Sequence, residues 1–304
     1  MKRGLDGTSL LASLTRHQLF LRQCRRDAKL VKKVGSELNH PLLDSQRYLL
    51  ENKPADVFYI LGGGASVNEL TATNFTQMAS SVSAGINFWP IHSFVPDILT
   101  AEANKNKPSS EYLNKLLDSR QIRTGDPHML LLRTLWPPRH NSLPRLTKTL
   151  ARRTQLYGRA NLVTKREENL PGDLKRVIRS LKRGSLPGSI LPDNGSSVCR
   201  LTFYALAQGF KKIVWVGVDQ SWGHYFWTEP PVPRHYRAAA KAEPRNVGEP
   251  HSTSSNIDRP FSNDIFLRQL AKVISSETGV EIFVSSSTST LSDTVPVFPW
   301  IQCD

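Results

Sequence analysis

Short apolar runs alternate along the chain with longer segments in which apolar residues recur every three or four positions. The short runs, rich in Val, Ile, Leu and Phe, predict buried parallel strands. They occupy residues 56–61, 82–88, 96–100, 129–133, 212–217 and 280–284. The longer segments predict helices. These occupy residues 10–31, 109–118, 196–208 and 262–275, with another helix opening at Ser66. The alternation predicts an α/β fold with a Rossmann-like, doubly wound, mostly parallel sheet.

The helical stripe near the N-terminus divides the chain into a basic helical segment, residues 1–50, and a single α/β domain, residues 51–304. The stripe consists of Leu10, Leu14, His17, Leu21, Cys24, Ala28 and Val31. Lys and Arg fill the other faces of this helix. Such a helix either lies on an anionic membrane surface or against a partner, or packs on the domain with a solvated basic face. The pattern leaves both interpretations open.

Within the domain, residues 134–192 show weaker periodicity and are rich in Pro, Arg and Leu. Helices are expected there at 147–156 and 173–182. We interpret this stretch as a basic insertion or lid.

The chain has a formal net charge of +14, and the excess is uneven. Residues 1–34 contain nine Lys and Arg against two Asp, and residues 120–183 contain sixteen against four acidic residues. This indicates a polyanionic partner. The common nucleic-acid motifs are absent, so nucleic acid is not the expected partner.

No apolar run is long enough to span a bilayer, and three scattered cysteines suggest neither disulfides nor zinc. We therefore expect a cytoplasmic protein. Oligomeric state has no sequence signal.

A glycine-rich turn, Gly62-Gly63-Gly64, follows the first predicted strand of the domain. Between a strand and a helix, such a turn exposes backbone N–H groups that suit a phosphate. Its spacing is not that of a dinucleotide fingerprint or a P-loop. A tight turn without a ligand is the alternative. Ser66, with Glu69 three residues later, predicts a helix N-cap.

Other polar residues end or follow strands at the edge where ligands bind in doubly wound sheets. Asn87 follows the second strand, and Asp219 follows the strand that ends at Gly217. Tyr225 lies in the aromatic loop after Asp219, and Ser197 lies in a small-residue turn before a helix. Each also has a structural interpretation, as a cap, a turn or core packing. No hydrolase triad, paired-cysteine motif or zinc motif occurs.

Four ordered motifs resemble those of the bacterial CMP-sialic-acid-dependent sialyltransferases. ILGGGASVNEL resembles their first strand and turn, and GINFW resembles their strand that ends in a nucleotide-contacting Asn. NGSSVCRLTFYALAQGFKKIVWVGVD resembles their later helix and strand, and PHS at 250–252 resembles the loop with the catalytic His. Together they cover roughly residues 56–102 and 192–290. The turn departs from the family pattern at Gly63 and Ala65.

The resemblance implies a variant of the nucleotide-sugar transferase fold and a glycosyltransferase with a CMP-sugar donor and no metal. The donor sugar is sialic acid, Kdo or a related acid, and the acceptor is a glycan of lipopolysaccharide or capsule. His251 would be the general base, and Tyr225 would hold the phosphate of the leaving group. The residues implied to bind CMP are Gly62, Gly64, Ser66, Asn87, Ser197, Gly217 and Asp219. Such an enzyme would work in the cytoplasm or peripherally at the inner membrane face.

Two other functions remain open. A nucleotide enzyme of the pyrophosphokinase type would need a metal, with Asp97, Glu102 and Asp219 as central acids. A non-catalytic polyanion-binding protein would bind through its basic segments and be indifferent to CMP.

Overall fold

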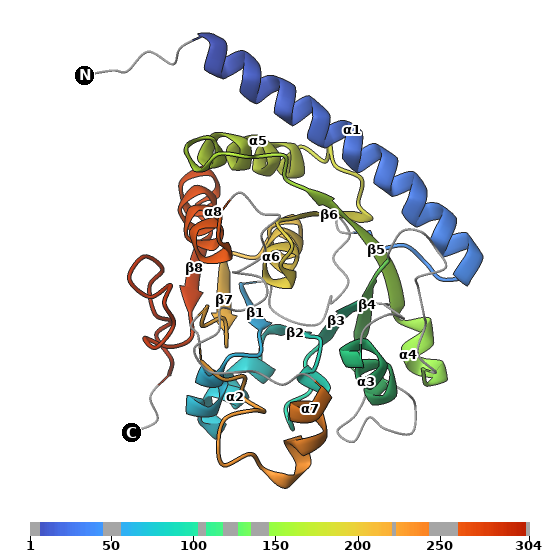
Figure 1. Cartoon of the computed structure of the whole chain (residues 1–304), viewed down its shortest axis with the longest axis vertical. Coiled ribbons are helices and arrows are strands. Elements are labelled where there is room, and N and C mark those ends of the chain that lie inside the picture. Colours follow the sequence, from blue (N-terminus) through green and yellow to red (C-terminus); the bar gives the residue numbers. More distant parts are fainter. Residues whose placement is uncertain are drawn as a thin grey trace.

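The computed structural model describes residues 7–44, 56–102, 108–117, 127–134, 146–220, 223–242 and 261–301 (Figure 1). Eight strands form one sheet in the order β6-β5-β4-β3-β2-β1-β7-β8, and each neighbouring pair is parallel. The strands are β1 (Val57–Leu61), β2 (Val82–Ile86), β3 (Ile98–Glu102), β4 (Met129–Arg133), β5 (Thr154–Asn161), β6 (Ile190–Asp193), β7 (Lys212–Val216) and β8 (Glu281–Val284). The predicted doubly wound α/β fold is confirmed.

Helices cover both faces of the sheet. They are α1 (Gly7–Leu38), α2 (Ala72–Ala79), α3 (Pro108–Leu117), α4 (Lys148–Arg152), α5 (Leu170–Lys182), α6 (Ser197–Ala207), α7 (Arg237–Ala242) and α8 (Asn263–Thr278). Short 3₁₀ helices are η1 (Ala65–Glu69), η2 (Trp89–Ile91), η4 (Glu167–Asn169) and η5 (Arg234–Tyr236). Figure 1 shows α6 inside the curve of the sheet with α5 and α8 on the same side, and α2, α3 and α7 on the opposite side.

The strands are buried on both faces, as expected where helices flank a parallel sheet. Alternate residues of β1 enter two different apolar clusters. Phe58 and Ile60 join the cluster on the α6 side, and Tyr59 and Leu61 join the cluster on the opposite side. This alternation follows from the two-residue period of a strand. The continuous apolar run in the sequence therefore reflects two cores, one on each face.

The interpretation of residues 134–192 as an insertion or lid is wrong for β5, β6 and α5, because the two strands belong to the sheet and α5 packs against α8. The expected helix over 147–156 is only the short α4, and its last residues begin β5. Gly158 and the charged Arg159 interrupt the apolar pattern of β5, which hid the strand. A Cβ at Gly158 would overlap Val31, so glycine is what lets α1 pack directly on this strand. The expected helix over 173–182 is confirmed as part of α5.

Helix α1 packs along β5 and α5 through Phe20, Cys24, Val31 and Val34. The predicted stripe is wrong at Leu14, whose residue surface is 41% exposed. The N-terminal half of α1 meets α5 through polar groups instead. Asp173 of α5 accepts hydrogen bonds from Ser13 Oγ at 2.9 Å and Arg16 Nε at 2.8 Å.

Candidate functional site

The glycine-rich turn after β1 is held against β7. The Gly62 amide donates to the Val216 carbonyl at 2.7 Å, and the Gly64 amide donates to the Gly217 carbonyl at 2.8 Å. A Cβ at Gly62 would lie 2.6 Å from the Gly217 oxygen. Gly217 itself has a φ of 62°, in the left-handed region that favours glycine. These glycines therefore allow two main chains to approach closely at the ends of β1 and β7.

The carboxylate of Asp219 lies beside this turn. It accepts hydrogen bonds from the Ser66 amide at 3.0 Å and from Ser66 Oγ at 2.5 Å. A Cβ at Gly64 would overlap the same carboxylate. Burial raises the pKa of Asp219, while the two hydrogen bonds from Ser66 act to lower it. The turn thus binds an acidic side chain of the protein through Ser66.

Protein acceptors thus occupy the amides of Gly62, Gly64 and Ser66, and the contact of these residues with a nucleotide stays a prediction. Within the described residues, the amides of Gly63 and Ala65 have no protein acceptor. A helix forms at the predicted place, but it is the short 3₁₀ helix η1, and Ser66 does not cap it. The α-helix α2 begins only at Ala72, with Thr71 as its N-cap in a capping box with Asn74.

The aromatic loop folds onto the turn. Tyr225 pairs with Gly64 as an isolated antiparallel bridge, and the Phe226 amide donates to the Gly63 carbonyl at 2.9 Å. The ring of Tyr225 stacks on Trp227, with centroids 4.5 Å apart and an interplanar angle of 14°. Trp227 Nε1 is buried without an acceptor among the described residues. The structure thus brings the candidate Tyr225 to the glycine-rich turn.

Asn87 and Ser197 occupy the same edge of the sheet. Asn87 follows β2 with a φ of 51°, and its amide continues the β2–β3 pairing by donating to the Thr100 carbonyl at 2.9 Å. Ser197 is the first residue of α6, and its hydroxyl accepts from Arg200 Nη2 at 2.6 Å. The amide of Ser196, which precedes it, donates to Asp193 Oδ1 at 3.0 Å. An oxyanion cradle there would therefore lack the Ser196 amide.

His251 lies in residues 243–260, outside the described residues. Among the other loop histidines, His92 is enclosed by aromatic rings, including Phe75 and Trp89. Burial, and then the proximity of His235, lower the pKa of His92 to about 4. His92 is therefore neutral at physiological pH and packs as part of an aromatic cluster.

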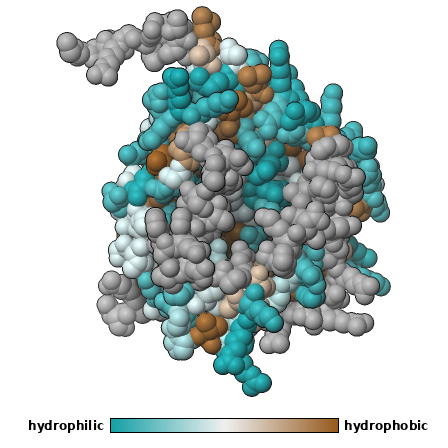
Figure 2. Space-filling view, viewed as in Figure 1, coloured by the Kyte–Doolittle hydropathy of each residue, from teal (hydrophilic) through white to brown (hydrophobic). Residues whose placement is uncertain are grey.

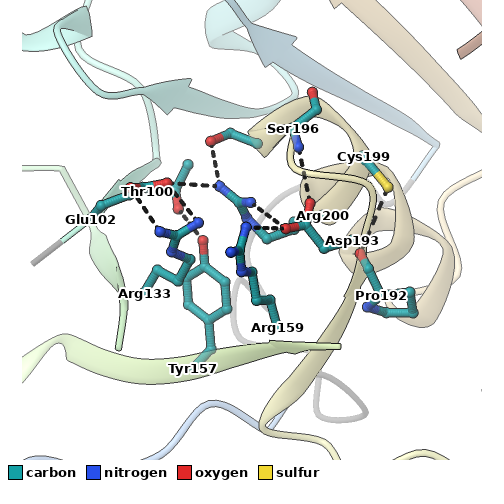
Figure 3. A network of polar contacts seen from close by, with 11 residues as sticks. Thr100, Glu102, Arg133, Tyr157, Arg159, Pro192, Asp193, Ser196, Cys199 and Arg200 are labelled. Carbon is teal, nitrogen blue, oxygen red and sulfur yellow. Dashed lines mark hydrogen bonds and ion pairs between the residues drawn. The ribbon is translucent and has the colours of Figure 1, made fainter. Parts of the chain in front are cut away.

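Sequence reasoning missed a buried ion-pair network at the carboxyl ends of β3 to β6 (Figure 3). We call its three arginines and two acids the arginine cluster: Arg133, Arg159, Arg200, Glu102 and Asp193. Both terminal nitrogens of Arg133 contact Glu102 at 2.8 Å. Asp193 Oδ2 accepts from Arg159 Nη1 at 3.1 Å and Arg200 Nη1 at 3.0 Å. The cluster joins three strand ends and α6 to β3.

Burial and like-charge repulsion act together in this cluster. Burial, and then the nearby Arg200, lower the pKa of Arg133 to about 10. Burial alone would raise the pKa of Asp193, but Arg200 and Arg159 hold it below its ordinary value. A sequence signal for the cluster exists. Arg200 is the one charged residue in the otherwise apolar or neutral α6, which indicates a buried partner.

Among the described residues, no group of three or more His, Cys, Asp or Glu is arranged to hold a metal ion. A membrane-spanning helix is likewise not found in the described part of the chain.

No protein-family model and no curated protein matches this sequence. Among solved structures, the chain is similar to the monofunctional α-2,3-sialyltransferase Cst-I from Campylobacter jejuni, with 14% identity and a TM-score of 0.48 over 85% of each chain. It is also similar to the sialyltransferase CstII from Campylobacter jejuni in complex with CMP-3FNeuAc. The identity there is 11% and the TM-score 0.45, over 81% of this chain and 87% of that one.

Proposed function

We propose that the protein is a glycosyltransferase that moves an acidic sugar from a CMP ester to a saccharide hydroxyl. The proposal is supported by four ordered sequence motifs whose described members meet at one edge of the sheet. The turn at residues 62–66, Asn87, Ser197 and Asp219 all follow the carboxyl ends of strands. That edge is where doubly wound sheets bind their ligands. Sialic acid, Kdo and related acids are the proposed sugars.

The hydrogen bonds of the turn determine how a nucleotide would be held. Since three of its amides are occupied, we assign nucleotide contact to the amides of Gly63 and Ala65, to Asn87 and to Ser197. Tyr225 would contact the phosphate of the leaving group. Asp219 then has a supporting role, because its hydrogen bonds with Ser66 fix the turn.

The proposed reaction needs no metal. The bond between the anomeric carbon and the CMP oxygen breaks, and both electrons leave with CMP. An acceptor hydroxyl oxygen forms the new bond to the same carbon, and His251 takes the hydroxyl proton as general base. Donors around the departing phosphate lower the barrier by stabilising its growing charge.

A nucleotide panel tests the donor assignment. We expect CMP to raise the melting temperature more than UDP or ADP does. Ligand that binds only the folded state adds about 2.7 kcal/mol at a concentration a hundred times its Kd. Differential scanning fluorimetry measures this. If no cytidine nucleotide shifts the transition, the CMP-donor proposal fails. Loss of activity in EDTA would instead favour the metal-dependent pyrophosphokinase-type alternative.

We further propose that α1 holds the enzyme on an anionic membrane surface, near a lipopolysaccharide or capsule acceptor. Its outward face carries three exposed leucines followed by six exposed cations, within an arc of roughly 140°. The leucines are Leu11, Leu14 and Leu19, and the cations are Arg22, Arg25, Arg26, Lys29, Lys32 and Lys33. Apolar and hydrophilic residues both reach the surface at the top of Figure 2, where Figure 1 shows α1. Such a face suits leucine insertion combined with attraction to anionic headgroups.

Charge reversal tests this docking. The variant Arg25→Glu, Lys29→Glu, Lys32→Glu should lose at least about 100-fold in affinity for phosphatidylglycerol vesicles, because each surface cation contributes about 1 kcal/mol. Sedimentation with vesicles measures binding, and phosphatidylcholine vesicles give the uncharged baseline. The matched control reverses three exposed cations on or beside α4: Lys148, Arg152 and Arg153. Equal losses in both variants would mean that net charge, and not α1, attracts the membrane.

A further inference from the structure

The charges of the arginine cluster do not cancel. Three guanidinium groups face two carboxylates, so one positive charge remains among the described residues. Arg133 and Arg200 are almost fully buried. The side chain of Arg159 is 40% exposed, so the cluster reaches solvent at this residue. An unpaired positive charge at this edge of the sheet favours the binding of an anion.

The hydrogen bonds of the cluster point to the same residue. Arg133 is bound at both ends of its fork by Glu102, and Arg200 donates to Asp193 and Ser197. Arg159 uses only Nη1, on Asp193. Its Nε and Nη2 have no acceptor among the described residues. Two further donors, the buried Nε atoms of Arg133 and Arg200, also lack an acceptor there. A native fold seldom leaves buried donors unmatched unless a ligand or water meets them.

We propose that the arginine cluster is an oxyanion subsite, in which Arg159 binds a carboxylate or phosphate oxygen pair of the sugar donor. This rests on the proposed function, because a CMP-linked acidic sugar carries both groups. Arginine presents two parallel N–H donors that match either anion. Arg200 is a positioning residue that holds Asp193, the carboxylate that Arg159 also binds, and Arg133 holds Glu102. Both arginines add positive charge near Arg159.

The sheet order and Ser197 set the position of the subsite. The cluster begins at β3, two strands from β1, and Arg159 itself lies on β5, four strands from β1. At the usual spacing β3 lies roughly 10 Å and β5 roughly 20 Å from β1. Ser197, which we assign to the nucleotide, accepts a hydrogen bond from Arg200 and so links the cluster to the proposed donor site. We expect the bound group to be the sugar carboxylate, which CMP alone lacks.

The substitution Arg159→Ala tests the subsite and leaves the charges of the cluster balanced. It leaves two arginines against two acids, and Asp193 keeps its bonds from Arg200 and Ser196. We therefore expect an unchanged urea-unfolding midpoint. Arg166→Ala, at a 77% exposed side chain in the same basic stretch, is the matched control. Arg159→Lys keeps the charge but loses the two-pronged geometry.

Calorimetric titration with CMP and with CMP-N-acetylneuraminic acid gives the readout, with CMP-Kdo as a second donor. We expect Arg159→Ala to weaken the CMP-sugar about ten- to a hundredfold and to leave CMP within twofold. The Lys variant should fall between. Equal weakening of CMP and CMP-sugar would identify the bound oxyanion as the phosphate. No change for either, while the wild-type protein binds both, would overturn the subsite.

A second arm separates this proposal from the donor assignment. Free N-acetylneuraminic acid and inorganic phosphate are added to the wild-type, Arg159→Ala and Arg166→Ala proteins, and the melting temperature is measured. If no cytidine nucleotide binds, the proposed function fails. The subsite still stands if either anion stabilises the protein in a way that requires Arg159. It fails if all three proteins respond alike.

Discussion

Replacing Asp193 by Asn is expected to destabilise the protein by about 3–5 kcal/mol. Asp193 is fully buried and accepts hydrogen bonds from Ser196, Arg159 and Arg200. Its loss leaves three arginines facing Glu102 alone, and Arg200 is only 2% exposed. Breaking one side of a buried pair costs far more than the pair itself contributes, because the remaining charge is unpaired in the interior. Urea unfolding measures the change.

The effect should depend on pH in a definite direction. Because the folded protein lowers the pKa of Asp193, this stabilisation is present above the ordinary pKa of 3.8 and is lost as the pH falls through the folded value. The difference in free energy of unfolding between the wild type and Asp193→Asn should therefore decrease at acidic pH. Asp56→Asn is the control, since its pair with Lys211 is exposed and should contribute little. A loss for Asp193→Asn no larger than that for Asp56→Asn would mean that the cluster does not hold α6.

Replacing His251 by Ala is expected to lower kcat by about 10²- to 10⁴-fold, the usual contribution of a general base. In the proposed mechanism His251 takes the proton of the acceptor hydroxyl and does not contact the nucleotide. CMP affinity should therefore stay close to that of the wild type. Transfer from CMP-N-acetylneuraminic acid to a glycan acceptor measures the rate, and calorimetry measures CMP binding.

His235→Ala is the matched control, because His235 is an exposed histidine of η5 in the same stretch between β7 and α8. We expect its rate to equal that of the wild type. Unimpaired transfer by His251→Ala would assign the base to another residue. A parallel loss of CMP affinity would place His251 in nucleotide binding instead.

The sequence predicted the sheet where strands are apolar and end in a turn signal. β1 is an apolar run that ends at three glycines, and its position was clear. The sequence did not predict β5, because two of its residues are determined by contacts outside the sheet ladder. Gly158 leaves room for Val31 of α1, and Arg159 forms an ion pair with Asp193 in the arginine cluster. Local periodicity cannot reveal a residue whose partner lies elsewhere in the chain, as Val31 does for Gly158 and Asp193 does for Arg159.

In the candidate site, too, the local motifs could be predicted from the sequence, but the contacts between distant segments could not. The sequence located the glycine-rich turn and Tyr225, and the structure brings them together. The sequence does not show that β7 lies beside β1. The amides of Gly62 and Gly64 were therefore expected to bind a ligand, whereas they donate hydrogen bonds to the carbonyls of Val216 and Gly217. The arginine cluster combines residues from β3, β4, β5, β6 and α6, and only the assembled fold makes it one site.

Because α1 packs against β5, it cannot be deleted without disturbing the fold. The helix carries the leucines and cations of the proposed membrane face, so deleting it is an obvious way to free the enzyme from lipid. The same helix covers part of the core with Phe20 and Cys24. Truncation would uncover apolar surface and remove an anchor from α5, so a shortened version should aggregate. Changes confined to the outward side chains separate the two roles of this helix.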